Sequence, residues 1–180
     1  IMTKHRVGII GLGIMGRRMV VNFDKHLRFE IAAVWDPSEQ SVSKTKIADP
    51  AVPFSNGPEE LILQENIDLL YIACPPEFHK KYALMAMEQG IPVYLEKPLG
   101  VDISDSKELV NELKRSKTPN IVNFVQASCE ALEITQDELR SGHAGDITSI
   151  DIIMQYQQWP RSWQVEADWL RFKSAGGYTR

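Results

Sequence analysis

The stretch from Val7 to Gly16 constrains the fold most, because it joins an apolar run to a glycine-rich turn and a helix start. Gly11, Gly13 and Gly16 have the spacing G-x-G-x-x-G. In a dinucleotide-binding fold the first glycine allows a tight turn, the second lets a diphosphate approach the backbone, and the third lets the helix pack closely on the sheet. The diphosphate binds free N–H groups at the positive helix end. The predicted cofactor cradle comprises Gly11, Leu12, Gly13, Ile14, Met15 and Gly16.

A second apolar strand, residues 29–35, ends at Asp36, 20 residues beyond Gly16. Dinucleotide folds place at this distance a carboxylate that accepts hydrogen bonds from the adenosine ribose. A carboxylate also repels the 2′-phosphate of NADP, and Pro37 offers no positive charge to offset the repulsion. The sequence therefore predicts NAD as the cofactor, with NADP less favoured. The structural alternative is a strand-end acid that caps the next helix.

Apolar strands alternate with helical patterns over roughly the first 125 residues, which predicts right-handed crossovers and an open, doubly wound parallel sheet of the Rossmann type. The six predicted strands are residues 7–10, 29–35, 52–54, 67–73, 91–95 and 121–125. Asp102 is the expected cap of a helix over 104–117. Ligands bind such sheets at the carboxyl ends of the strands. Gly11, Asp36, Cys74 and the pair Glu96-Lys97 all follow strands, so we expect them along one edge.

The pattern changes after residue 126. A helix is expected over 130–141, and residues 147–156 alternate between apolar and polar, which is typical of a strand with one wet face. We therefore predict a dinucleotide-binding domain over 1–126. Residues 127–180 are predicted to begin a second, α+β domain with a mainly antiparallel sheet. This second part is too short to bury its own core, so it is expected to be incomplete.

Composition disfavours several classes of protein. The 20 basic and 24 acidic residues give a net charge of −4 without a basic stripe, which argues against nucleic-acid binding. Cys74 and Cys129 form no C-x-x-C motif, so either a reducing compartment or no redox role is expected. The four histidines lack the spacing of a helical metal site, and no metal is predicted. The N-terminal apolar run is too short for a membrane span, so we expect a cytoplasmic protein.

Four motifs give the chain a resemblance to the Gfo/Idh/MocA oxidoreductases. They are the glycine turn 11–16, the proline-and-histidine turn 74–79, the segment 90–99 with Glu96-Lys97-Pro98, and the turn 141–147. The Glu-Lys-Pro triplet is the most specific of them. The resemblance implies hydride transfer between a nicotinamide and a hydroxyl or keto carbon of a small polar substrate, such as a sugar or polyol. It also implies a homo-oligomer, a dimer or tetramer, built through the C-terminal sheet.

Residues 175–180 resemble the glycine-rich stretch that precedes an acid and a histidine in this family. Those two residues lie beyond Arg180, so a truncated chain is expected.

The resemblance also implies roles for single residues. Lys97 is the expected catalytic residue, as the proton partner of the substrate oxygen. Glu96 is expected near the nicotinamide ribose or holding Lys97, with a simple ion pair to Lys97 as the alternative. The resemblance also implies that the Lys97-Pro98 bond can be cis, as the corresponding bond is in some relatives. The expected wall beside the nicotinamide comprises Cys74, Pro75 and Pro76, with Cys74 as a small filler and His79 as a packing or capping residue behind it.

Two other functions remain open. A non-catalytic dinucleotide-binding sensor needs the glycines and Asp36 but has no use for Lys97, which favours an enzyme. A dehydrogenase of the aspartate-semialdehyde type is disfavoured, because no base lies near a cysteine in the sequence pattern. Three tryptophans either line a substrate pocket or pack the second sheet: Trp159, Trp163 and Trp169.

Overall fold

The computed structural model describes residues 3–64, 66–158 and 161–177. The chain divides into two compact units. The first comprises Ile1–Asn123 and Trp163–Arg180, and the second comprises Phe124–Ser162. The predicted domain limits, 1–126 and 127–180, stay a prediction.

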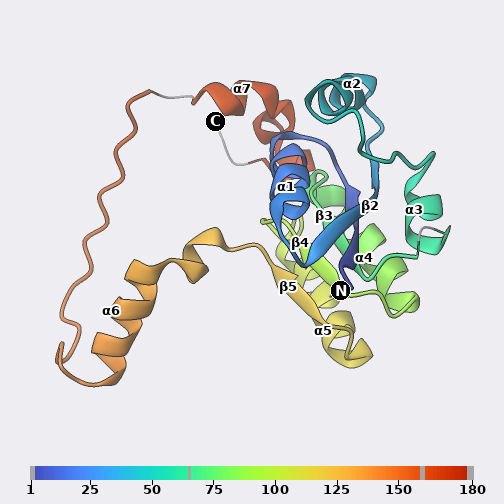
Figure 1. The fold of residues 1–180 in the computed structure, drawn as a ribbon. Helices are drawn as coiled ribbons and strands as arrows, with labels where there is room; N and C mark the ends of the chain where they lie inside the picture. Colours follow the sequence, from blue (N-terminus) through green and yellow to red (C-terminus); the bar gives the residue numbers. More distant parts are fainter. Residues whose placement is uncertain (1–2, 65, 159–160, 178–180) are drawn as a thin grey trace. The chain divides into compact units, whose positions relative to one another are not determined.

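A five-stranded parallel sheet forms the centre of the first unit, in the order β2-β1-β3-β4-β5 (Figure 1). Its strands are β1 (His5–Ile10), β2 (Phe29–Trp35), β3 (Leu69–Ile72), β4 (Val93–Leu95) and β5 (Asn120–Val122). The order reverses beside β1, because the chain first builds outward to β2 and then crosses back to β3. The predicted doubly wound α/β fold is confirmed.

The predicted strand at 52–54 is wrong. Only Phe54 forms an isolated parallel bridge, with Val34 of β2. Val34 donates its N–H to the Pro53 carbonyl at 2.9 Å and accepts from the Ser55 N–H at 3.0 Å. Pro53 itself has no N–H, so the ladder cannot extend toward residue 52.

Helices cover both faces of the sheet, and strand residues alternate between two cores. The helices of the first unit with at least seven residues are α1 (Ile14–Lys25), α2 (Glu39–Ala48), α3 (Pro58–Gln64), α4 (His79–Glu88) and α5 (Ile103–Ser116). Val20 and Phe23 of α1 pack on one face, against Tyr71 among others. On the other face, side chains of α3, α4 and α5 pack against Leu70 and Ile72. This double coverage explains why β3 reads as a continuous apolar run.

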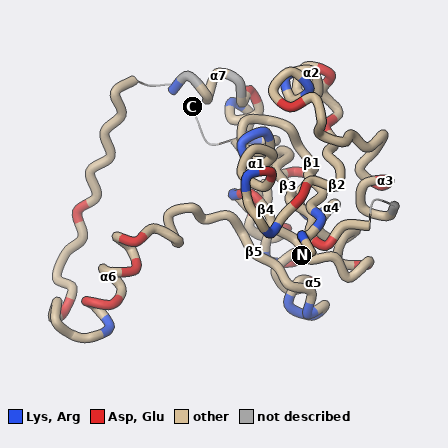
Figure 2. The backbone as a smooth tube through the Cα atoms, viewed as in Figure 1, with Lys and Arg blue, Asp and Glu red and all other residues tan. Residues whose placement is uncertain are grey.

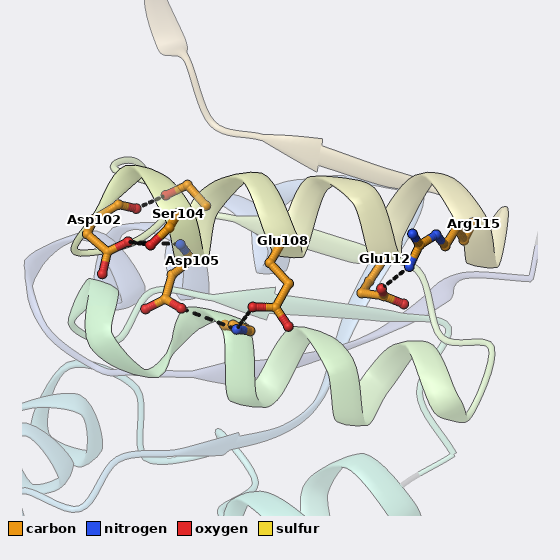
Figure 3. A network of polar contacts seen from close by, with 8 residues as sticks. Asp102, Ser104, Asp105, Glu108, Glu112 and Arg115 are labelled. Carbon is orange, nitrogen blue, oxygen red and sulfur yellow. Dashed lines mark hydrogen bonds and ion pairs between the residues drawn. The ribbon is translucent and has the colours of Figure 1, made fainter.

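The start of α5 is capped as predicted. Asp102 accepts the Asp105 N–H at 2.8 Å and the Ser104 hydroxyl at 2.7 Å (Figure 3). The backbone N–H of Asp105 is the main reason why the pKa of Asp102 is lowered. Lys80 of α4 forms ion pairs with Asp105 and Glu108 of α5 at 3.2 and 2.6 Å, so exposed charges link these two neighbouring helices.

The second unit contains α6 (Glu130–Arg140), but the strand predicted at 147–156 does not form. These residues pair with no other described segment, and side chains such as Ile150, Ile152 and Ile153 are largely exposed. A strand is defined by its ladder to a neighbour, so alternation alone cannot produce one. The antiparallel sheet expected here is absent from the described residues.

Charges of both signs are interleaved along the chain (Figure 2). Within the described ranges, no three His, Cys, Asp or Glu side chains are grouped closely enough to hold a metal ion. None of the described helices has the length and apolar character of a membrane span.

The packing of α5 on the sheet generates a stability prediction. Leu109 is fully buried, so Leu109→Ala should lower the free energy of unfolding by about 2–5 kcal/mol. Ile103 lies on the same helix but is 74% exposed, so Ile103→Ala should change it by less than about 0.5 kcal/mol. Urea unfolding followed by circular dichroism measures both. Equal costs for the two variants would contradict this packing.

Candidate functional site

The carboxyl ends of the strands form one aligned edge, because each first residue past a strand still bonds to its neighbour. Four backbone hydrogen bonds continue the ladder: Gly11 to Trp35 at 2.9 Å, Ala73 to Ile10 at 2.8 Å, Glu96 to Ile72 at 2.9 Å and Asn123 to Leu95 at 2.8 Å. The N–H of the first residue in each pair donates to the carbonyl of the second. The predicted site residues 11, 36, 74 and 96–97 therefore follow strands that end at the same level.

The three glycines of the turn have different surroundings. Gly11 has φ +95°, and a Cβ there would lie 2.4 Å from the Cys74 nitrogen. A Cβ on Gly16 would lie 1.8 Å from the Gly11 carbonyl oxygen. At Gly13 a Cβ would meet no described atom within 4 Å. Protein packing thus requires glycine at two positions, whereas Gly13 opens a space through which a ligand can approach the backbone.

Charged side chains fix the peptide groups of the turn. Asp36 accepts the Leu12 N–H at 2.6 Å through one carboxylate oxygen and the Ser38 N–H at 2.7 Å through the other. Arg17 donates to the Leu12 carbonyl at 2.8 Å. Asp36 is not the cap of α2, the alternative to a ribose-binding role. The Ser38 hydroxyl caps this helix by accepting the Ser41 N–H. Each carboxylate oxygen of Asp36 has a second lone pair, which a ribose hydroxyl can use.

The turn after β3 forms a wall that holds two prolines and one acid, Glu77. Burial raises the pKa of the Cys74 thiol to about 12, so it stays protonated at physiological pH and serves as a filler. Pro76 begins a short 3₁₀ turn, Pro76–Phe78, which leads into α4. His79 is buried at the start of α4, with Nε2 2.8 Å from the Cys74 carbonyl oxygen. Burial lowers the pKa of His79, as suits a neutral packing residue.

Glu96 and Lys97 face different environments. Glu96 is buried, and it accepts hydrogen bonds from Tyr71 and Asn123. Lys97 is exposed, and its ammonium has no hydrogen-bond or ion-pair partner among the described residues. The alternative of a Glu96–Lys97 ion pair is therefore wrong. The cis peptide bond between Lys97 and Pro98 is confirmed.

Sequence reasoning missed Tyr71 and Asn123. Two signals were available: a single hydroxyl-bearing residue within the aliphatic strand β3, and a short amide directly after the last strand. Neither signal identifies Glu96 as the hydrogen-bond partner unless the strand order is known, because Tyr71 of β3 and Asn123, which follows β5, lie on either side of β4.

The glycine-rich tail lies against the proline wall within the first unit. A Cβ on Gly176 would be 3.2 Å from the Pro76 side chain and 3.6 Å from that of Val101. Trp163 and Trp169 belong to the same unit. Trp159 and residues 178–180 lie outside the described residues, as does the end of the predicted glycine-rich stretch.

The site fits a dinucleotide, since the open approach at Gly13 lies between an α1 N-terminus and the Asp36 carboxylate. Residues 5–124 match the family model described as the oxidoreductase family with an NAD-binding Rossmann fold. The chain belongs to the Gfo/Idh/MocA family. The resemblance read from the four motifs is thereby confirmed.

Two curated relatives and one solved structure are similar to this chain. The rhizopine catabolism protein MocA of Rhizobium meliloti is 26% identical over 81% of this chain and 45% of its own length. Inositol 2-dehydrogenase of Corynebacterium glutamicum is 26% identical over 79% of this chain and 43% of its own. A crystal structure of scyllo-inositol dehydrogenase from Lactobacillus casei, with bound NAD(H) and scyllo-inositol, has a TM-score of 0.73 at 22% identity. The match covers 81% of this chain and 44% of the scyllo-inositol dehydrogenase chain. The chain thus spans less than half the length of these relatives.

The contrast between two glycines generates a binding prediction. Gly13→Ala should weaken NADH binding about tenfold or more while leaving the melting temperature unchanged, because its Cβ meets only the space for a ligand. Gly16→Ala should instead lower the melting temperature, because its Cβ overlaps the Gly11 carbonyl. Calorimetric titration and thermal unfolding separate the two effects. Normal NADH affinity in Gly13→Ala would show that the diphosphate does not approach there.

Proposed function

We propose that this protein is an NAD-dependent dehydrogenase or reductase that transfers a hydride between the nicotinamide and a hydroxyl or keto carbon of a sugar-like or polyol-like substrate. The observation that carries the proposal is the exposed Lys97 ammonium, without a described partner, on the same strand edge as the glycine cradle. The substrate class follows the relatives, which include inositol 2-dehydrogenase and a scyllo-inositol dehydrogenase. A sensor would have no use for that ammonium.

Each part of the edge has a distinct binding task in this proposal. Backbone N–H groups of residues 11–16 bind the diphosphate at the start of α1. Asp36 binds the adenosine ribose hydroxyls and repels a 2′-phosphate, so NAD is favoured over NADP. The residues beside the nicotinamide are Cys74, Pro75, Pro76, Glu96 and Lys97. Once bound, the nicotinamide supplies the site that accepts or donates the hydride.

Lys97 is the proposed proton donor to the substrate oxygen in reduction and the proton acceptor in oxidation. When a keto group is reduced, the ammonium donates a proton to the oxygen as the hydride reaches the carbon. In the reverse direction the amine takes the hydroxyl proton. The side chains of Pro75 and Pro76 cannot transfer a proton, so Lys97 is the proposed proton partner of the substrate oxygen.

Several features of the whole protein remain predictions. A homo-oligomer, either dimer or tetramer, is predicted through the C-terminal sheet. A cytoplasmic location is likewise predicted from the sequence alone.

The role of Lys97 predicts the effect of Lys97→Met. Turnover of the natural protein with NAD and an inositol should fall by about two to four orders of magnitude, because the oxygen loses its proton partner. NADH affinity should be unchanged, since the glycine cradle is intact. Lys107→Met, an exposed lysine of α5, is the matched control and should keep full turnover. Near-normal turnover of Lys97→Met would rule out this role.

The position of Asp36 predicts a shift in cofactor preference. Asp36→Ser removes the charge that repels the 2′-phosphate, so the ratio of NADP to NAD affinity should rise about tenfold or more. Binding titrations with both reduced cofactors measure the ratio. Ser38→Ala, which removes only the α2 cap, is the control for damage to the neighbouring helix. An unchanged ratio in Asp36→Ser, or equal affinities in the wild type, would refute the assignment.

A further inference from the structure

A buried polar network lies directly behind the Glu96-Lys97 turn. The Tyr71 hydroxyl donates to Glu96 Oε1 at 2.5 Å, and Asn123 Nδ2 donates to the same oxygen at 2.6 Å. The Lys97 backbone N–H donates to Glu96 Oε2 at 3.3 Å. Tyr71 is fully buried, and Glu96 and Asn123 are only 5% and 8% exposed.

The network joins three strands of the sheet. Tyr71 belongs to β3, Glu96 follows β4, and Asn123 follows β5. Tyr94 of β4 adds a further link, since its hydroxyl donates to Asn123 Oδ1 at 2.8 Å. That bond turns the amide so that Nδ2 faces Glu96. The carboxylate is therefore held from both neighbouring strands.

The surroundings of Glu96 make it a rigid group. A buried carboxylate is costly unless donors satisfy it, and here three donors reach its two oxygens. No basic side chain among the described residues bonds to it. Burial, and then the bond to Glu96, raises the pKa of Tyr71, so the hydroxyl remains a donor at physiological pH.

We propose that Tyr71 and Asn123 are positioning residues, which hold Glu96 so that its second oxygen fixes the Lys97 backbone at the hydride-transfer site. This inference rests on the proposed function of Lys97. Neither residue touches the substrate or cofactor in this scheme. They act through Glu96, and Glu96 acts through the N–H of Lys97, leaving the ammonium free for the substrate oxygen.

Tyr71→Phe tests the proposal, because it removes one hydroxyl and keeps the ring. In the natural protein, kcat should fall about tenfold while the NADH dissociation constant stays within about twofold. The Lys97 amide, followed by NMR hydrogen exchange, should exchange about tenfold faster. Thr45→Val is the matched control, since it removes a buried hydroxyl that donates to the Ser41 carbonyl of its own helix α2. It should change neither readout.

A double-variant cycle separates positioning from general loosening of the fold. Glu96→Gln still accepts from Tyr71 and Asn123 through its one oxygen, but it turns an amide N–H₂ toward the Lys97 N–H. It should lower kcat, and adding Tyr71→Phe should lower kcat by less than about twofold more. Asn123→Ala provides a second donor deletion should Tyr71→Phe fail to fold.

The outcomes distinguish this inference from the proposed function. The positioning role is overturned if Tyr71→Phe keeps the wild-type kcat, or if its Lys97 amide exchanges at the wild-type rate. Fully additive effects in the double-variant cycle would also overturn it. Loss of turnover in Lys97→Met, seen in the same series, would leave the proposed function standing. If the wild type transfers no hydride, the proposed function fails, and the Lys97 exchange rate alone then supports or overturns the positioning.

Discussion

The close contact of three backbone segments at Gly11 is the constraint on which the rest of this structure depends. Gly11 lies between the start of α1 and the end of β3, with room for a side chain on neither Gly11 nor Gly16. This contact brings the N-terminus of α1 to the carboxyl edge of the sheet. Because Asp36 bonds the next residue, Leu12, the edge of β2 is tied to the same turn. The cradle is thus part of the sheet rather than a flexible loop.

The sheet also sets the distance between the two ends of the site. Asp36 follows β2 and Lys97 follows β4, which are three interstrand steps apart in the order β2-β1-β3-β4. Parallel neighbours are about 4.8 Å apart, so the two residues lie on strands separated by roughly 14 Å. Backbone hydrogen bonds beyond the last strand residues keep these ends level. An elongated ligand with a recognition group at each end suits such an edge.

The sequence predicted those parts of the molecule whose cause is local. The glycine spacing, the apolar run of β3 and the Asp102 cap each reflect a few neighbouring residues, and the structure has all three. Residues 52–54 and 147–156 failed as strands because pairing depends on a distant partner. The contacts of Tyr71 and Asn123 with Glu96 could not be predicted for the same reason, since only the strand order brings these residues together. The site as a whole was read mainly from Glu96-Lys97-Pro98 and the glycines.

The direction of the backbone after β4 explains why Glu96 and Lys97 do not form an ion pair, and the absence of this pair bears on the proposed function. At the end of β4, Glu96 turns toward the sheet, on the same face as Tyr94, whereas Lys97 turns to the exposed side. Glu96 still continues the ladder through its N–H to the Ile72 carbonyl, whereas Lys97 lies in the bend that follows, so opposite charges next to each other in sequence need not meet. A lysine paired with that carboxylate would have to break the pair before it could reach a substrate oxygen. By satisfying Glu96 with Tyr71 and Asn123 instead, the fold uses the carboxylate to hold the Lys97 backbone and leaves its ammonium available.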